Sequence, residues 1–157
     1  MSNKVKTVYI AGPITGDPKY RGKFSAAADM LMQRGYAVVN PVKMCWPIRW
    51  NPRYEVLAKC FGAVAGVECL ALLPGWGDSK GANAEIEVFL RTHKTDDLVF
   101  LLDDDGYMEK VTVDDMFNAL TRFDRQGVAE LVCEEDEDVK RAIWLAKDKY
   151  NIEFNPR

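Results

Sequence analysis

Apolar residues along the chain follow two spacings, and each spacing predicts one kind of secondary structure. Short runs rich in β-branched and aromatic residues predict strands at 4–11, 36–39, 67–73 and 98–102. Between these runs, apolar residues three or four positions apart predict helices at 24–34, 54–65 and 81–93. Strands that alternate with helices are typical of a parallel sheet covered on both faces. We therefore predict an α/β fold, flavodoxin-like or Rossmann-like, with a doubly wound parallel sheet of about five strands.

Beyond residue 105 this alternation stops. The spacing of apolar residues predicts helices at 113–123 and 134–150, and a short apolar run at 128–132 is consistent with a strand. We accordingly divide the chain into an α/β domain at 1–105 and a C-terminal helical extension at 106–157. The apolar side chains of this extension either pack on their own domain or contact a partner subunit. They are Met116, Phe117, Leu120, Ile143, Trp144 and Leu145.

Composition narrows the classes of partner. The chain has 157 residues, of which 48% are hydrophobic, and this suffices for one domain with a substantial core. Its 21 basic and 24 acidic residues give a net charge of −3, which argues against binding to nucleic acid polymers or to an anionic membrane. The sequence shows neither a signal peptide nor the charge-free stretch of about 20 residues that a membrane helix needs. We expect a cytoplasmic protein whose partner is a small molecule.

The cysteines and the histidine indicate neither a disulfide framework nor a metal site. Four cysteines occur without a C-x-x-C pair, and His93 is the single histidine. This composition favours reduced thiols and supplies no ligand set for a metal ion. The glycine fingerprint of a dinucleotide site is missing as well. We therefore expect no cofactor.

In an open parallel sheet, ligands bind outside the carboxyl ends of the strands. The first predicted strand ends in a loop of mostly small residues, whose backbone can approach a ligand closely. This loop contains Gly12, Pro13, Ile14, Thr15 and Gly16. Asn40, at the end of the second strand, either contacts a sugar or a base or only terminates the strand.

The segment after the third predicted strand carries the strongest signal for a ligand site. Its loop and first helical turn contain Trp76, Asp78, Ser79, Lys80 and Gly81. Backbone N–H groups at the start of a helix favour a phosphate or a carboxylate there. Glu85 follows within the first two turns, close enough to reach the same cavity. From spacing alone, a capped helix with a solvated glutamate is an equally good interpretation.

Three motifs, in this order, resemble the nucleoside 2-deoxyribosyltransferase superfamily. They are the segment 9–16, the segment 35–41 with Gly35-Tyr36 and Asn40-Pro41, and the segment 72–85 that ends in Glu85. The similarity extends over residues 5 to 103. It is greatest to a small branch common in phages and prophages, and then to the 2′-deoxynucleoside 5′-monophosphate N-glycosidases. The resemblance implies the same α/β fold and a homodimer or larger homo-oligomer.

By this resemblance, Glu85 is the nucleophile that attacks the anomeric carbon, and Tyr9 orients it. Ser79 and the loop 12–16 correspond to phosphate contacts of the glycosidases. The implied reaction is hydrolysis of the N-glycosidic bond of a 2′-deoxynucleoside 5′-monophosphate, which gives a free base and deoxyribose 5-phosphate. A carboxylate suits this chemistry because it stabilises or traps an oxocarbenium-like sugar. The alternatives are deoxyribosyl transfer to a second base and a binding module that sequesters a nucleotide without turnover.

Two departures from the motifs of this superfamily concern the site. Thr15 stands where the best-known hydrolases have an arginine, so that Lys80 or Arg21 would have to supply the positive charge. Cys60 occupies the position of an aspartate that contacts the sugar or helps to protonate the leaving base. Because a thiol does not replace a carboxylic acid as proton donor, Asp78 is the nearest substitute in the sequence.

Aromatic side chains near the predicted site are candidates for stacking on a nucleobase. Trp46, Trp50 and Tyr54 follow the second strand, and their alternative role is to fill the core or a subunit contact. Trp76, in the glycine-bearing loop, either stacks on the base or holds the loop in position.

Overall fold

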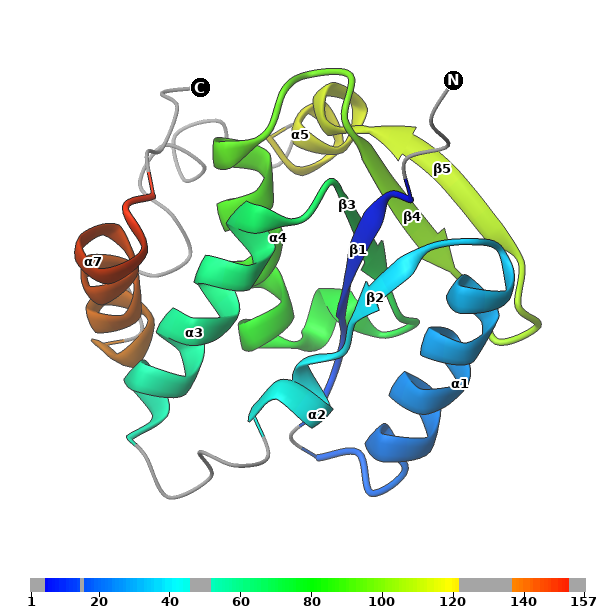
Figure 1. The fold of residues 1–157 in the computed structure, drawn as a ribbon, viewed down its shortest axis with the longest axis horizontal. Coiled ribbons are helices and arrows are strands. Elements are labelled where there is room, and N and C mark those ends of the chain that lie inside the picture. Colours follow the sequence, from blue (N-terminus) through cyan, green and yellow to red (C-terminus); the bar gives the residue numbers. More distant parts are fainter. Residues whose placement is uncertain (1–4, 15, 46–51, 122–136, 153–157) are drawn as a thin grey trace.

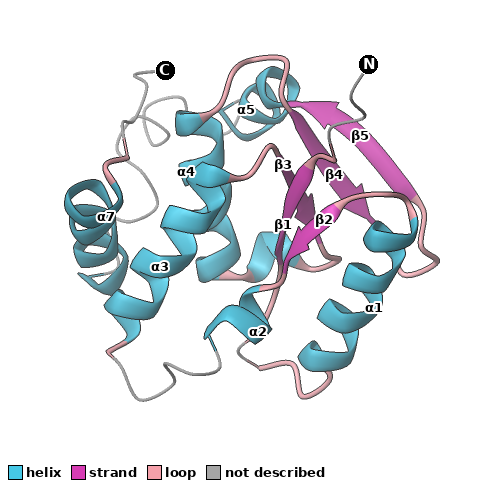
Figure 2. Cartoon of the chain, in the orientation of Figure 1, coloured by secondary structure: helices cyan, strands magenta, loops and turns pink. Residues whose placement is uncertain are grey.

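The computed structural model describes residues 5–14, 16–45, 52–121 and 137–152. It contains a five-stranded sheet with helices on both faces (Figures 1 and 2). The predicted fold class, a doubly wound α/β fold, is confirmed. None of the helices in these residues is long and apolar enough to cross a membrane.

The strands of the sheet are β1 (Thr7–Ala11), β2 (Ala37–Val39), β3 (Cys69–Leu72), β4 (Leu98–Leu102) and β5 (Met108–Thr112). They lie in the order β2-β1-β3-β4-β5, which is the flavodoxin-like order. The first four strands are parallel. Every residue of β1 after Thr7 and every residue of β3 is buried, as expected for central strands that helices cover on both sides.

The helices are α1 (Tyr20–Gln33), α2 (Pro41–Cys45), α3 (Arg53–Gly66), α4 (Lys80–Thr92), α5 (Val113–Thr121) and α7 (Glu137–Tyr150), with a short 3-10 helix η2 (Trp76–Asp78). On one face of the sheet, α1 shares an apolar cluster with β1 and β4 that includes Phe24, Leu31 and Phe100. On the other face, α3, α4 and α5 surround a larger cluster that includes Tyr9, Phe61 and Phe89. In Figure 1, α7 lies on the far side of α3 from the sheet, and the two helices pack against each other.

The ends of the predicted helices agree with the structure to within a few residues. The predictions at 24–34, 54–65 and 81–93 correspond to α1, α3 and α4. Gly35 follows α1 with a φ of 94°, the left-handed conformation that glycine adopts after a helix end. The five-residue helix α2 was not predicted.

The fifth strand differs from the prediction in both position and direction. Residues that we assigned to the helical extension form β5, which pairs with β4 in an antiparallel arrangement. The short turn between these strands leaves no room for the crossover that a parallel strand requires. Asp103 stabilises the turn because its Oδ1 accepts hydrogen bonds from the N–H groups of Asp105 and Tyr107, each at 2.9 Å. The strand predicted at 128–132 lies outside the described residues.

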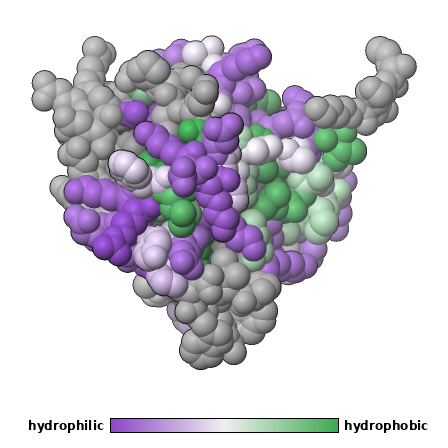
Figure 3. All heavy atoms as spheres, turned by 60° about the vertical axis from the view of Figure 1, so that its left-hand side comes forward, coloured by the Kyte–Doolittle hydropathy of each residue, from purple (hydrophilic) through white to green (hydrophobic). Residues whose placement is uncertain are grey.

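The apolar side chains of the C-terminal part pack mostly on their own chain. Met116 and Ile143 are buried in the larger cluster, and Phe117 and Leu145 are half-buried against it. Trp144 is the exception, because 79% of its surface is exposed. On the face that carries α7, hydrophilic residues predominate around smaller hydrophobic areas (Figure 3). The side chain of Leu120 lies outside the described part.

Candidate functional site

The loops after β1 and β3 contact each other, because these strands are neighbours in the sheet. The N–H of Leu73 donates to the carbonyl oxygen of Ala11 at 2.9 Å, which continues the pairing beyond the strand ends. A Cβ atom on Gly12 would lie 2.7 Å from the Cβ of Leu73, so the close approach of the two loops requires glycine. Gly75 has a φ of 85°, and Pro13 packs against it. The structure therefore brings together the loops that follow β1 and β3, which we call the strand exits of β1 and β3.

Two side chains fix the loop between β3 and α4. Ser79 is the N-cap of α4, and its Oγ accepts a hydrogen bond from the N–H of Ala82 at 3.2 Å. Asn83 Nδ2 lies 3.3, 3.0 and 2.8 Å from the carbonyl oxygens of Trp76, Gly77 and Ser79. Ser79 and Asn83 thus hold the loop to the first turn of α4. We did not predict the role of Asn83, and its only signal in the sequence is an amide side chain four residues after Ser79.

Glu85 and Tyr9 lie together in the interior next to this loop. Glu85, on α4, is 8% exposed, and Tyr9, on β1, is fully buried. The pKa of Tyr9 is raised well above its usual value, first by burial and then by the negative charge of Glu85. Tyr9 therefore presents a neutral hydroxyl group beside the carboxylate. No hydrogen bond of ordinary geometry to this hydroxyl occurs among the described residues.

Cys60 is the third group beside the Tyr9 hydroxyl. It lies on α3, is 6% exposed and contributes to the raised pKa of Tyr9 after Glu85 does. Three elements far apart in the sequence, β1, α3 and α4, thus place a phenol, a thiol and a carboxylate in one buried cluster. Cys60 and Cys69 are both buried cysteines that form no disulfide.

Other predicted site residues lie at the exposed rim of the strand exits. Asp78 and Lys80 are exposed on either side of Ser79, and Gly81 is half-buried. In the first loop, Ile14 is 41% exposed and Gly16 has a φ of 85°. The predicted residue Thr15 lies outside the described part.

The loop after β1 is closed by an ion pair. Lys23 Nζ lies 2.7 Å from Asp17 Oδ2, and this contact lowers the pKa of Asp17 and raises that of Lys23. Arg21 was predicted, as an alternative to Lys80, to supply positive charge at the site. Its Nε donates a hydrogen bond to the Tyr20 hydroxyl at 3.1 Å.

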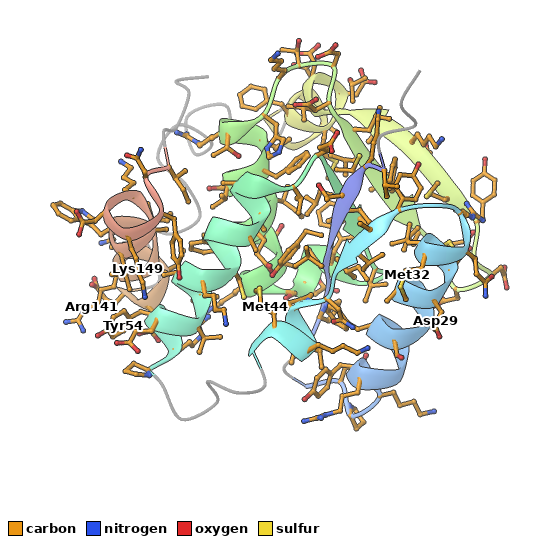
Figure 4. The ribbon with its side chains drawn as sticks, viewed as in Figure 1. Asp29, Met32, Met44, Tyr54, Arg141 and Lys149 are labelled. Atoms are coloured by element: carbon orange, nitrogen blue, oxygen red, sulfur yellow. The ribbon has the colours of Figure 1, made fainter. Side chains whose placement is uncertain are left out.

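Asn40 lies away from Glu85, at the start of α2. Its Oδ1 accepts a hydrogen bond from the N–H of Val42 at 3.0 Å, so Asn40 caps the start of α2. It also lines a groove of about 410 Å³ along β2, between α1 and α2. Met32 and Met44 approach this groove from either side of β2 (Figure 4). A second hollow, of about 180 Å³, lies beside α1 at the ends of β3 and β4.

Two of the aromatic candidates, Trp76 and Tyr54, have structural partners. Trp76 is half-buried against the larger cluster, which supports its alternative role of holding the loop. Tyr54 lies where α3 meets α7, and the guanidinium of Arg141 sits 5.6 Å from the centre of its ring (Figure 4). Trp46 and Trp50 lie outside the described residues. Within the described part, no three His, Cys, Asp or Glu side chains group into a possible metal site.

A comparison of the sequence with models of known protein families gives a match. A family model described as "Domain of unknown function (DUF4406)" matches residues 6–95, which is more than half of the chain. The chain belongs to this family. No curated protein matches the sequence.

The DUF4406 match begins with β1 and ends just after α4. It therefore includes the Tyr9, Cys60 and Glu85 cluster and both loops that contact each other. The strands β4 and β5 and the helices α5 and α7 follow the matched segment. The candidate site is thus built by the DUF4406 segment alone.

Proposed function

We propose that this protein hydrolyses the N-glycosidic bond of a 2′-deoxynucleoside 5′-monophosphate. The observation that carries this proposal is the burial of Glu85 beside the Tyr9 hydroxyl, next to the joined exits of β1 and β3. The resemblance of segments 9–16 and 72–85 to the nucleoside 2-deoxyribosyltransferase superfamily supports the same reaction class. The geometric observation and the sequence resemblance concern the same two residues, Tyr9 and Glu85.

The chemistry follows from a carboxylate placed beside the anomeric carbon. A carboxylate oxygen of Glu85 forms a bond to C1′ while the bond from C1′ to the base nitrogen breaks. The base leaves with the electron pair and takes up a proton from water or from Asp78. Water then attacks C1′ and gives up a proton to solvent or to Asp78, the ester bond breaks and leaves Glu85 as a carboxylate, and deoxyribose 5-phosphate departs. In the substrate complex, the neutral Tyr9 hydroxyl beside Glu85 donates a hydrogen bond to it and so orients the attacking oxygen, a bond that does not have ordinary geometry in the present structure.

The 5′-phosphate has a natural place at the start of α4. The first N–H groups of a helix lack intrahelical partners, and the helix dipole favours a negative charge there. Lys80, at the first helical position, adds a positive charge. We assign the phosphate to this region because of this helix start and this lysine, together with the resemblance of Ser79 and the loop 12–16 to phosphate contacts of the glycosidases.

The test is to incubate the protein with the four deoxynucleoside monophosphates and their ribonucleotide counterparts, and to separate the products by chromatography. We expect a free base and deoxyribose 5-phosphate from at least one deoxynucleotide. If a second added base is converted into a new nucleotide, with no free sugar phosphate, the reaction is transfer. Full recovery of every nucleotide contradicts cleavage and favours the binding module.

A further inference from the structure

The strand β2 lies at one edge of the sheet, and its backbone is open on one side. Among the described strands, only β1 pairs with it. The N–H of Ala37 donates to the carbonyl oxygen of Lys6 at 3.0 Å, so Ala37 directs its backbone groups toward β1. Because successive residues of a strand direct these groups to opposite sides, Val38 directs its N–H and its carbonyl oxygen to the open side. Val38 therefore offers one donor and one acceptor to a further strand.

The two edge strands of the sheet differ in their side chains. Proteins commonly protect an edge strand with charged residues or proline, because an open edge can pair with another chain. The opposite edge strand, β5, carries the exposed residues Glu109 and Lys110. The sequence of β2 is Ala-Val-Val, which contains neither a charged residue nor proline. The edge at β2 is therefore the one whose residues do not oppose pairing with a further strand.

The groove of about 410 Å³ along β2 continues this apolar edge to both sides of the strand. Ala28 and Met32 line it from α1, and Met44 lines it from α2. Met32 is 50% exposed. Val38 packs on the apolar cluster beside α1, and Val39 packs on the cluster at the other face of the sheet. A strand that paired with β2 would thus meet apolar side chains at both faces of the sheet.

We propose that the β2 edge binds a second copy of this chain, with the two β2 strands antiparallel around a two-fold axis at Val38. A residue on such an axis faces itself in the partner. Antiparallel residues that face each other as a hydrogen-bonded pair exchange two N–H to carbonyl bonds, and Val38 has both groups on the open side. The two sheets then form one continuous sheet. Because α1 covers the face toward which Val38 points, Val38 and Met32 of both copies meet on that face.

The charges beside the groove are complementary in this arrangement. Lys43 lines the groove just after the end of β2, and Asp29 is exposed on α1, one turn before Met32 (Figure 4). Within the described part of the chain, neither residue forms an ion pair. The last turns of α1 lie beside the start of β2, and antiparallel pairing brings the end of one β2 to the start of the other. Lys43 of each copy therefore lies toward the partner's Asp29, which gives two equivalent pairs of opposite charge.

Sedimentation equilibrium of the full-length protein, over a range of concentrations, tests this interface. We expect a species of twice the chain mass in the wild type. Val38→Pro removes the outward N–H but no hydrogen bond to β1, so we expect a folded monomer. Met32→Lys places two like charges near the axis and should raise the dissociation constant of the dimer at least about tenfold. The control is Ala26→Lys, which adds the same charge to α1 beside the other hollow and should leave the dimer unchanged.

An exchange of charges tests the antiparallel arrangement itself. Asp29→Lys and Lys43→Glu should each weaken the dimer, and the double variant should restore it, because each pair then forms again with its signs exchanged. No recovery in the double variant contradicts the antiparallel arrangement.

Two results overturn the proposal as a whole. One is a wild-type protein that stays monomeric at every concentration. The other is a dimer that persists in both Val38→Pro and Met32→Lys, because the second copy then binds elsewhere. A melting curve shows whether each variant is folded, and the exposed position of Met32 keeps the test decisive even if Val38→Pro does not fold.

Discussion

The hydroxyl of Tyr9 lies beside the carboxylate of Glu85, although the two residues belong to the first strand and the fourth helix. Both side chains are buried. Burial and the negative charge of Glu85 raise the pKa of Tyr9, which keeps its proton on the phenol oxygen. A neutral phenol next to a carboxylate is a potential hydrogen-bond donor, and in the proposed reaction this donor directs the attacking oxygen of Glu85.

Replacement of Tyr9 by phenylalanine tests this orientation. A hydrogen bond to a charged group contributes roughly 1.5–3 kcal/mol, so we expect kcat for base release to fall about 10- to 100-fold in Tyr9→Phe. KM should change little, because Tyr9 is fully buried and therefore has no exposed surface with which to contact a substrate. The matched control is Tyr36→Phe, which removes a hydroxyl from a half-buried tyrosine that packs on Phe100. A kcat of Tyr9→Phe equal to that of the control would contradict the role of Tyr9.

The raised pKa of Tyr9 also predicts a dependence of stability on pH. In the unfolded chain Tyr9 ionises near its ordinary pKa of roughly 10, whereas in the folded chain it stays protonated to a higher pH. Its contribution is therefore complete below about pH 10 and is lost as the pH rises toward the folded-state pKa. Burial raises the pKa of Cys69 as well, so its ionisation also lowers the free energy of unfolding as the pH rises. This second effect is the same in the wild type and in Tyr9→Phe.

Urea unfolding at about pH 9, 10 and 11 measures this effect. We expect the free energy of unfolding to fall less steeply with pH in Tyr9→Phe than in the wild type. Parallel curves for the two proteins would show that the ionisation of Tyr9 is not linked to folding.

The contact between the two strand exits predicts that Gly12 tolerates no side chain. The added methyl group of Gly12→Ala would lie 2.7 Å from the Cβ of Leu73 and force the loops apart. We expect a loss of stability of about 1–3 kcal/mol, as for other overpacked sites. The control is Gly22→Ala in α1, where nothing lies within 4 Å and alanine should stabilise the helix by up to about 1 kcal/mol. Chemical denaturation of both variants measures whether the free energy of unfolding falls in Gly12→Ala and rises in Gly22→Ala. An unchanged stability of Gly12→Ala would contradict the contact between the two loops.

Ser79 should contribute to stability through its cap, apart from any role in binding. Loss of the hydrogen bond from Ala82 in Ser79→Ala is expected to destabilise the protein by about 1 kcal/mol. Ser25→Ala, an exposed change inside α1, should be neutral or slightly stabilising. Thermal unfolding of the pair distinguishes a cap from a surface serine. Equal melting temperatures would mean that Ser79 does not cap α4.

Much of the fold could be predicted from the sequence because its strands and helices have strong and different periodicities. The runs that form β1, β3 and β4 are almost entirely apolar, and parallel strands buried on both faces have this character. β5 was missed because its sequence, Met-Glu-Lys-Val-Thr, has two polar residues between its apolar ones and so lacks the alternation of a strand, and because it follows an acidic cluster that marks a turn. An edge strand of this kind is half-exposed, so its pattern is weak.

The site could be predicted only as far as topology determines it. Parallel strands end at the same edge of a sheet, and this rule predicted that the loop after Ala11 and the loop after Leu73 lie at one edge. It does not determine the direction of backbone carbonyls, which is why the contacts of Asn83 were missed. The approach of Cys60 to Tyr9 depends on how α3 packs on the sheet, and no local pattern in the sequence encodes that packing.

The central claim is that Glu85 carries out the cleavage, and one comparison of two variants tests it most directly. Glu85→Gln and Glu87→Gln make the same change on the same helix, at two glutamates that are each 8% exposed. The measurement is the rate of base release from the deoxynucleotide that the wild-type protein prefers, together with a melting curve for each variant. We predict that Glu85→Gln folds and loses at least 99% of the rate (~100-fold or more), while Glu87→Gln keeps most of it. A folded Glu85→Gln protein that releases base as fast as Glu87→Gln would contradict the account.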